Sequence, residues 1–147
     1  MVCAATMREK KVNGRKRHYG VDTQGYLLRV LAQPADEQDR DGARPLLKML
    51  HHCFPRLEKL WADGGYAGGL VDWARETLGL TLDIVKKLAD QQGFVVLPRR
   101  WVVERTIAWL NRNRRLSKDY EHHEMCSESI VYLASIRLLL RRLTKAA

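Results

Sequence analysis

Residues 17–33 read RHYGVDTQGYLLRVLAQ and predict a pair of β-strands. Residues 17–22 and 26–33 are both rich in the aromatic, aliphatic and β-branched residues that favour an extended backbone. The three residues between them, Thr23-Gln24-Gly25, form a short connection in which glycine supplies a positive φ at little cost. This stretch therefore predicts an antiparallel hairpin joined by a tight turn.

The chain beyond the hairpin alternates between helical and strand patterns. Helices are expected where apolar residues recur every three or four positions, and strands where apolar and polar residues alternate. The predicted helices cover residues 43–54, 70–78, 101–114 and 127–143, and the predicted strands cover residues 57–62 and 81–86. Pro55 ends the first helix, Gly79 caps the second and Ser127 caps the last. This order predicts one α/β domain over residues 1–147.

The charge of the chain points to a polyanionic partner. Lys and Arg number 26 against 17 Asp and Glu, which gives a formal net charge of +9. The excess lies in two blocks, residues 13–18 (NGRKRH) and 98–118 (PRRWVVERTIAWLNRNRRLSK). Trp101 and Trp109 stand among the arginines of the second block, an arrangement that suits contacts to nucleic acid. The alternative interpretation is a pair of solvated charged faces.

The sequence predicts a cytoplasmic protein without a membrane segment. The longest apolar run, residues 129–140, is interrupted by Arg137 and falls short of the ~18 residues that cross a bilayer. Residues 1–11 do not have the order of a secretory signal. Cys3, Cys53 and Cys126 are odd in number and widely spaced, which indicates reduced thiols in a cytoplasm.

Asp63 and Glu104 are the acidic residues that could carry chemistry. Asp63 directly follows the predicted strand 57–62, and Glu104 lies on the polar side of helix 101–114 with Arg100 and Arg115. A carboxylate at a strand end and another on a basic helix are parts of a magnesium site that acts on a phosphodiester. The structural alternatives are a turn role for Asp63 and an ion pair or solvent exposure for Glu104.

Longer motifs resemble one known family. They are residues 14–28 (GRKRHYGVDTQGYLL), 34–43 (PADEQDRDGA), 61–68 (WADGGYAG), 93–121 (GFVVLPRRWVVERTIAWLNRNRRLSKDYE) and 132–143 (YLASIRLLLRRL). They look like the carboxyl-terminal part of the catalytic domain of bacterial insertion-sequence transposases, and most like the insertion-sequence-five family. The resemblance implies a DDE domain of ribonuclease H-like fold, with a mixed sheet flanked by helices, that cuts and joins DNA using Mg²⁺ or Mn²⁺.

The resemblance assigns roles to individual residues. The family's second catalytic aspartate falls on Asp63 and its glutamate on Glu104, which makes these two the expected catalytic residues and metal ligands. Leu97 and Asn111 stand where the wider superfamily has a tyrosine and a lysine, so the roles of those positions stay open. The residues expected to contact DNA phosphates are Lys16, Arg17, Arg100, Arg105, Arg112, Arg114 and Arg115.

The family's first catalytic aspartate lies on a strand upstream of the GRKRH block. Residues 1–13 show no strand pattern and hold Glu9 as their one acidic residue, so we expect this chain to lack the first strand. Residues 1–12 are expected to be poorly ordered, and the strand 17–22 is expected to have a free edge. Asp22 lies on the hairpin and is not expected to replace the aspartate. The chain alone is therefore expected to be inactive in strand cleavage.

Three functions are compatible with the sequence. The chain is a transposase fragment, a non-enzymatic product that binds DNA or an intact transposase, or a general nucleic-acid-binding protein in which Asp63 and Glu104 are structural. The first two also allow a homo-oligomer. A zinc site at His122, His123 and Cys126 is not expected, because four ligands are needed and no second pair is evident.

Overall fold

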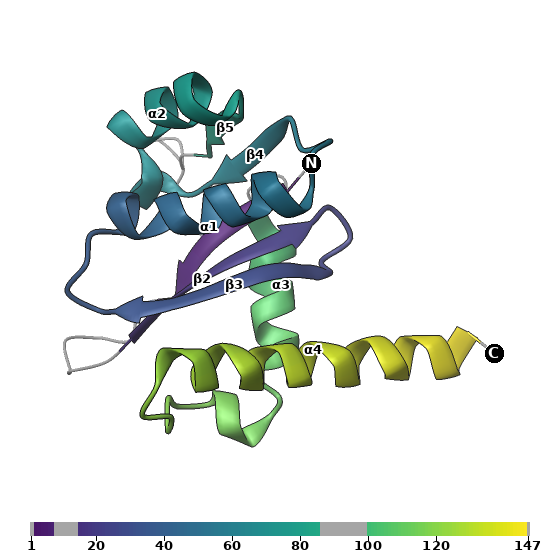
Figure 1. Ribbon diagram of the computed structural model, residues 1–147. Coiled ribbons are helices and arrows are strands. Elements are labelled where there is room, and N and C mark those ends of the chain that lie inside the picture. Colours follow the sequence, from purple (N-terminus) through teal and green to yellow (C-terminus); the bar gives the residue numbers. More distant parts are fainter. Residues whose placement is uncertain (1, 8–14, 86–99, 147) are drawn as a thin grey trace, which may run out of the picture.

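The computed structural model of the chain describes residues 2–7, 15–85 and 100–146. A sheet of five strands forms its centre, in the order β3-β2-β1-β4-β5 (Figure 1). The strands are β1 (Val2–Met7), β2 (Arg15–Asp22), β3 (Leu27–Pro34), β4 (Lys59–Ala62) and β5 (Thr81–Ile84). Strand β2 is antiparallel to β1 and to β3, whereas β4 is parallel to β1 and to β5. The prediction of an α/β fold with a mixed sheet is confirmed.

The prediction that the first strand is missing is wrong, because β1 is the central strand. It pairs with β2 from Val2↔Asp22 to Met7↔Arg17, and with β4 from Val2↔Leu60 to Ala4↔Ala62. The residues VCAATM show no alternation of polar and apolar types, and a strand in the middle of a covered sheet does not need one. Strand β2 consequently has a neighbour on each side, so the predicted free edge is absent. Residues 8–12 lie outside the described residues.

Helices cover both faces of the sheet (Figure 1). The helices are α1 (Asp39–Cys53), α2 (Gly69–Leu78), α3 (Arg100–Leu110) and α4 (Glu124–Ala146). Leucines of α1 and α2 form one buried cluster with Leu60 and Ala62 of β4. Apolar residues of α3 and α4 form a second buried cluster that includes Trp61 of the same strand. Successive side chains of a strand point to opposite faces, so β4 separates the two clusters.

The predicted hairpin is confirmed. Its turn contains Gly25 at φ 88°, and the Asp22 carboxylate accepts the backbone N–H groups of Gln24 at 2.9 Å and Tyr26 at 2.8 Å. Asp22 lies opposite Val2, at the end of β1 away from Met7. Its carboxylate therefore stabilises the turn.

The two carboxyl-terminal helices differ from their predicted bounds. Helix α3 ends at Leu110, because a turn follows and leads into a short 3-10 helix, Arg114–Leu116. Helix α4 begins at Glu124, three residues before Ser127. Ser127 is buried and its hydroxyl accepts a hydrogen bond from Arg17 Nε at 2.9 Å. The prediction that Ser127 caps this helix is therefore wrong, because the hydroxyl serves a tertiary contact instead.

Candidate functional site

Asp63 lies where β4 ends, as predicted. It caps a short 3-10 helix, Gly64–Tyr66, and its Oδ1 accepts the backbone N–H of Gly65 at 2.9 Å. This contact is the turn role that the sequence allowed. The carboxylate is half-buried, so it remains partly accessible from solvent.

Asp39, which sequence reasoning did not single out, lies beside Asp63. A Cβ atom added to Gly65 would be 3.1 Å from Asp39 Oδ2 and 3.1 Å from Asp63 Oδ1. The two carboxylates thus stand close together, separated by a glycine that carries no side chain. Asp39 is also paired with Lys16, whose Nζ lies 3.1 Å from Asp39 Oδ1. Its position at the start of α1 was the available signal, because acidic residues favour the first turn of a helix.

His18 forms the buried floor of this region. Its Nδ1 shares a hydrogen bond of 2.8 Å with the Tyr66 hydroxyl, and both residues are 1% exposed. Burial lowers the pKa of His18 to about 4, although the nearby Asp39 carboxylate opposes that shift. The imidazole is therefore neutral at pH 7, and the acidic pair receives its compensating charge from Lys16.

Glu104 is exposed on the outer side of α3, as its helical position predicts. Val102 and Leu110, on the opposite side of the helix, are buried. Thr106 fixes the helix to the hairpin turn, since its hydroxyl donates to the Gly25 carbonyl at 2.9 Å. A Cβ on Gly25 would lie 2.7 Å from that hydroxyl oxygen, so the close approach requires glycine.

Strand β1 carries no carboxylate at the level of Asp63. The parallel register of the two strands ends at Ala4 and Ala62, one residue before Ala5 and Asp63. Strand β1 reads Val-Cys-Ala-Ala-Thr-Met and contains neither Asp nor Glu. No residue of β1 is therefore a carboxylate that could match the first aspartate implied by the resemblance.

The described residues do not assemble a full metal centre. Within residues 15–85 and 101–144, no group of three or more His, Cys, Asp or Glu side chains is placed to hold a metal ion. Mg²⁺ binds in a near-octahedral set of oxygen ligands, and the described residues bring two carboxylates together, those of Asp39 and Asp63. The donor set that the structure describes therefore does not fit a two-metal site.

Two basic residues of the first block, Lys16 and Arg17, are buried. Lys16 is 5% exposed and also donates to the Glu37 carbonyl. Arg17 is 8% exposed and pairs with Asp119 at 3.2 Å. Ion pairs inside the molecule occupy both side chains, which leaves little of either for a DNA phosphate.

The basic residues of the second block are mostly accessible. Arg112, Arg114 and Arg115 are exposed or half-buried, and Arg115 pairs with Glu121 at 2.7 Å. Arg105 is half-buried and stacks on two indole rings, 4.3 Å from the centroid of Trp101 and 4.6 Å from that of Trp109. Arg100 begins α3, and its side chain lies outside the described residues.

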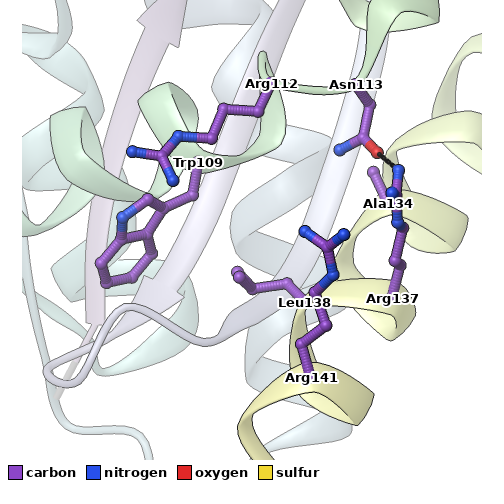
Figure 2. A pocket seen from close by; sticks show the side chains of 7 residues that line it. All are labelled: Trp109, Arg112, Asn113, Ala134, Arg137, Leu138 and Arg141. Carbon is purple, nitrogen blue, oxygen red and sulfur yellow. Dashed lines mark hydrogen bonds between the residues drawn. The ribbon is translucent and has the colours of Figure 1, made fainter.

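Helix α4 contributes arginines that sequence reasoning did not assign to a site. Figure 2 shows Arg137 and Arg141 of α4 around a cleft shared with Arg112 and Trp109. The two arginines of α4 are separated from Arg112 by more than twenty positions along the chain, so no local pattern groups them.

Among the helices whose residues are described, none is long and apolar enough to cross a membrane.

The molecule is thus an α/β domain with a mixed sheet, a carboxylate directly after β4 and a group of exposed arginines beyond α3. The model of the transposase DDE domain matches residues 4–139. The chain belongs to the family of transposases with this domain. It is also 30% identical, over 115 residues, to the "Putative transposase for insertion sequence element IS402" of Burkholderia cepacia. That alignment covers 74% of this chain and 54% of the relative, so the chain spans about half the length of this relative.

Proposed function

We propose that this chain is a DNA-binding domain of an insertion-sequence transposase whose own residues do not complete the metal centre. The observation that supports the proposal is the register of β1 and β4, whose last pair, Ala4 and Ala62, comes one residue before Ala5 and Asp63. A DDE domain implies a divalent metal, Mg²⁺ or Mn²⁺. Because residue 5 is alanine, the proposal leaves the chain with two of the family's three catalytic carboxylates. These two are Asp63, which matches the second aspartate, and Glu104, which matches the glutamate.

The fold supports the ribonuclease H-like part of the proposal. A mixed five-stranded sheet covered by helices on both faces is the architecture that the motifs imply. Asp63 at the end of β4 is in the position that the family resemblance assigns to a catalytic carboxylate. The motifs WADGGY and RRWVVERT also support membership of the insertion-sequence-five group.

Loss of one carboxylate affects cleavage far more than DNA binding. Two metal ions clamp the attacking and leaving oxygens only when their ligands are held in place, and a displacement of about 1 Å can cost ~10²-fold in rate. DNA binding relies instead on arginine side chains, which are not metal ligands. We therefore expect the chain to bind DNA without cleaving or joining it.

The DNA-binding surface of the proposal consists of the accessible arginines. Arg105, Arg112, Arg114 and Arg115 follow one another on α3 and the turn beyond it. Lys16 and Arg17 are not part of this surface, because both are buried in ion pairs. Their contribution is to stabilise the fold. The insertion-sequence ends and the target DNA are the proposed partners, by similarity to the Burkholderia cepacia protein.

Regulation of transposition is the function that fits such a domain. A chain that occupies DNA without cleaving it would compete with an intact transposase for the same sites. Association with an intact transposase, or with a second copy of the chain, is part of this proposal.

The free thiols Cys53 and Cys126 are exposed, which supports the proposal of a reducing cytoplasm.

A nicking assay with Mg²⁺ or Mn²⁺ tests the proposal. The 147-residue chain is compared with Ala5→Asp, and Ala4→Asp, one position earlier in the same strand, is the control. We expect the chain and the control to bind DNA without nicking it, and Ala5→Asp to gain metal-dependent nicking or, at minimum, metal binding by calorimetry. Nicking by the unchanged chain that disappears in Asp63→Asn and Glu104→Gln would show that its metal centre is complete.

A further inference from the structure

A cleft between α3 and α4 combines three arginines with an apolar floor. Trp109 of α3 and Ala134 and Leu138 of α4 line its interior, and Asn113 lines its side. Arg112, Arg137 and Arg141 surround it, as Figure 2 shows. Ala134 is buried and the other apolar residues are partly covered, whereas the three arginines reach solvent. The charge therefore lies at the rim, where a solute can reach it.

Among the described residues, no carboxylate lines this cleft to balance the arginines. Arg137 donates to the Asn113 side-chain oxygen at 3.0 Å, which is a contact to a neutral amide. Within the part of the chain that the structure describes, neither Arg112 nor Arg141 forms an ion pair through its side chain. Like charges held close together repel, and a bound anion is the simplest way to offset that repulsion.

The size of the cleft favours a phosphate group. Its volume is about 100 Å³, below the ~300–1,000 Å³ of pockets that enclose drug-sized ligands. Guanidinium groups suit such an anion, because each offers several N–H donors in a planar fork that matches phosphate oxygens. A single tetrahedral anion fits these dimensions better than a base with its sugar.

Trp109 acts in the cleft as a rigid wall. The guanidinium of Arg142 lies 4.5 Å from its ring centroid, and that of Arg105 lies 4.6 Å from it. Arg142 also stacks on Tyr26 at 4.8 Å, which connects α4 to the hairpin. Because two cations already cover this indole, it is poorly suited to stack on a base, and the recognition falls to the arginines.

We propose that the α3–α4 cleft binds a phosphate group of a DNA strand through Arg112, Arg137 and Arg141. The choice of DNA over a small anion rests on the proposed function and on Arg114 and Arg115, two exposed arginines that follow Asn113 of the cleft in the chain. A strand needs several phosphate contacts in succession, whereas a single anion needs one. Trp109 is five residues beyond Glu104, or ~7.5 Å along the helix axis, so the cleft lies within a few nucleotides of the candidate helical carboxylate.

The test compares DNA binding by two double variants of the 147-residue chain. Arg137→Gln with Arg141→Gln removes two charges from the cleft, and Arg56→Gln with Arg75→Gln removes two exposed charges elsewhere. Binding of a labelled 20-nucleotide DNA, single-stranded or duplex, is measured by anisotropy between 50 and 200 mM salt. We expect the cleft variant to bind about 10-fold more weakly than the control, with a salt slope lower by about 2 for the duplex.

Two further measurements separate the possible results. A third variant, Arg137→Lys with Arg141→Lys, keeps the charge but loses the planar fork, and we expect an intermediate affinity. Thermal unfolding of each variant shows whether the fold is retained. Equal losses of affinity in the cleft variant and the control would overturn the cleft as a site while leaving DNA binding intact.

The source of the phosphate is tested with inorganic phosphate. Its binding is followed by the NMR shift of the Arg112 Nε–H group, which the wild-type chain and the cleft variant both have. Shifts that DNA reproduces and that the cleft variant loses would support the proposal. A cleft that binds phosphate but is not perturbed by bound DNA would be a small-anion site and would overturn it. Failure of the wild-type chain to bind any DNA would overturn the proposed function as well.

Discussion

The Lys16 ammonium lies 3.1 Å from Asp39 Oδ1, at the end of the sheet where Asp63 follows β4. The two side chains are 7% and 12% exposed, so the pair is removed from water. A basic residue expected to bind DNA phosphate thus balances a carboxylate next to the candidate catalytic aspartate. This pairing joins the GRKRH block to the acidic region through the interior of the domain.

Breaking this ion pair should destabilise the protein strongly. We expect Lys16→Met and Asp39→Asn each to lower the free energy of unfolding by about 3 kcal/mol, because each leaves a buried charge without its partner. The double variant should lose less than the sum of the two. Lys59→Met and Asp83→Asn form the control, since that pair is 39% and 43% exposed and is expected to contribute ~1 kcal/mol or less. Similar effects in both pairs, measured by urea unfolding, would contradict this prediction.

The buried His18 should make stability depend on pH. The unfolded chain takes up a proton near the ordinary pKa of 6.5, whereas the folded chain resists protonation until about pH 4. Stability is therefore unaffected by His18 above pH 6.5 and falls as the pH drops from 6.5 to 4, by up to about 3 kcal/mol. The variant His18→Gln should show a shallower fall over this range. Parallel pH profiles of the two proteins, from denaturant unfolding, would show that the imidazole does not contribute.

Gly25 should be far less tolerant of substitution than Gly79. Both have a positive φ, 88° and 64°, but only at Gly25 would an added Cβ meet another atom, the Thr106 hydroxyl oxygen at 2.7 Å. Gly79→Ala should cost ~1–2 kcal/mol for the left-handed backbone alone. Gly25→Ala should cost more, and Thr106→Ser should not relieve it, because the hydroxyl remains. Equal losses of stability would indicate that α3 is not held against the turn in this way.

Arg114 should contribute to DNA affinity without contributing to sequence selectivity. It lies in the turn beyond α3, and a phosphate contact neutralises charge without reading a base. Arg114→Ala should weaken binding to unrelated sequences by the same factor and lower the salt slope by about 1. Arg75→Ala, on α2 at the opposite face of the sheet, is the matched control. A loss confined to one sequence would indicate base recognition instead.

Local chemistry determined most of the secondary structure. The hairpin, the helix that begins at Asp39 and the strand that ends before Asp63 follow from side-chain periodicity and from turn residues, all of which act within a few positions. The exposure of Glu104 follows in the same way, since a helix repeats every 3.6 residues. β1 gave no such signal, because a central strand in a sheet covered on both faces needs no polar side to alternate with an apolar one.

Only the tertiary structure decided which charged side chains remain accessible to a ligand. Arg17 pairs with Asp119 and Arg137 meets Asn113, contacts that join residues up to about a hundred positions apart. The register that pairs Ala4 with Ala62 and the cleft that Arg112 shares with Arg141 also depend on residues far apart in the chain. Periodicity specifies which face of an element is apolar, but burial and ion pairing depend on which elements become neighbours. That choice depends on strand order and helix packing, which no local pattern encodes.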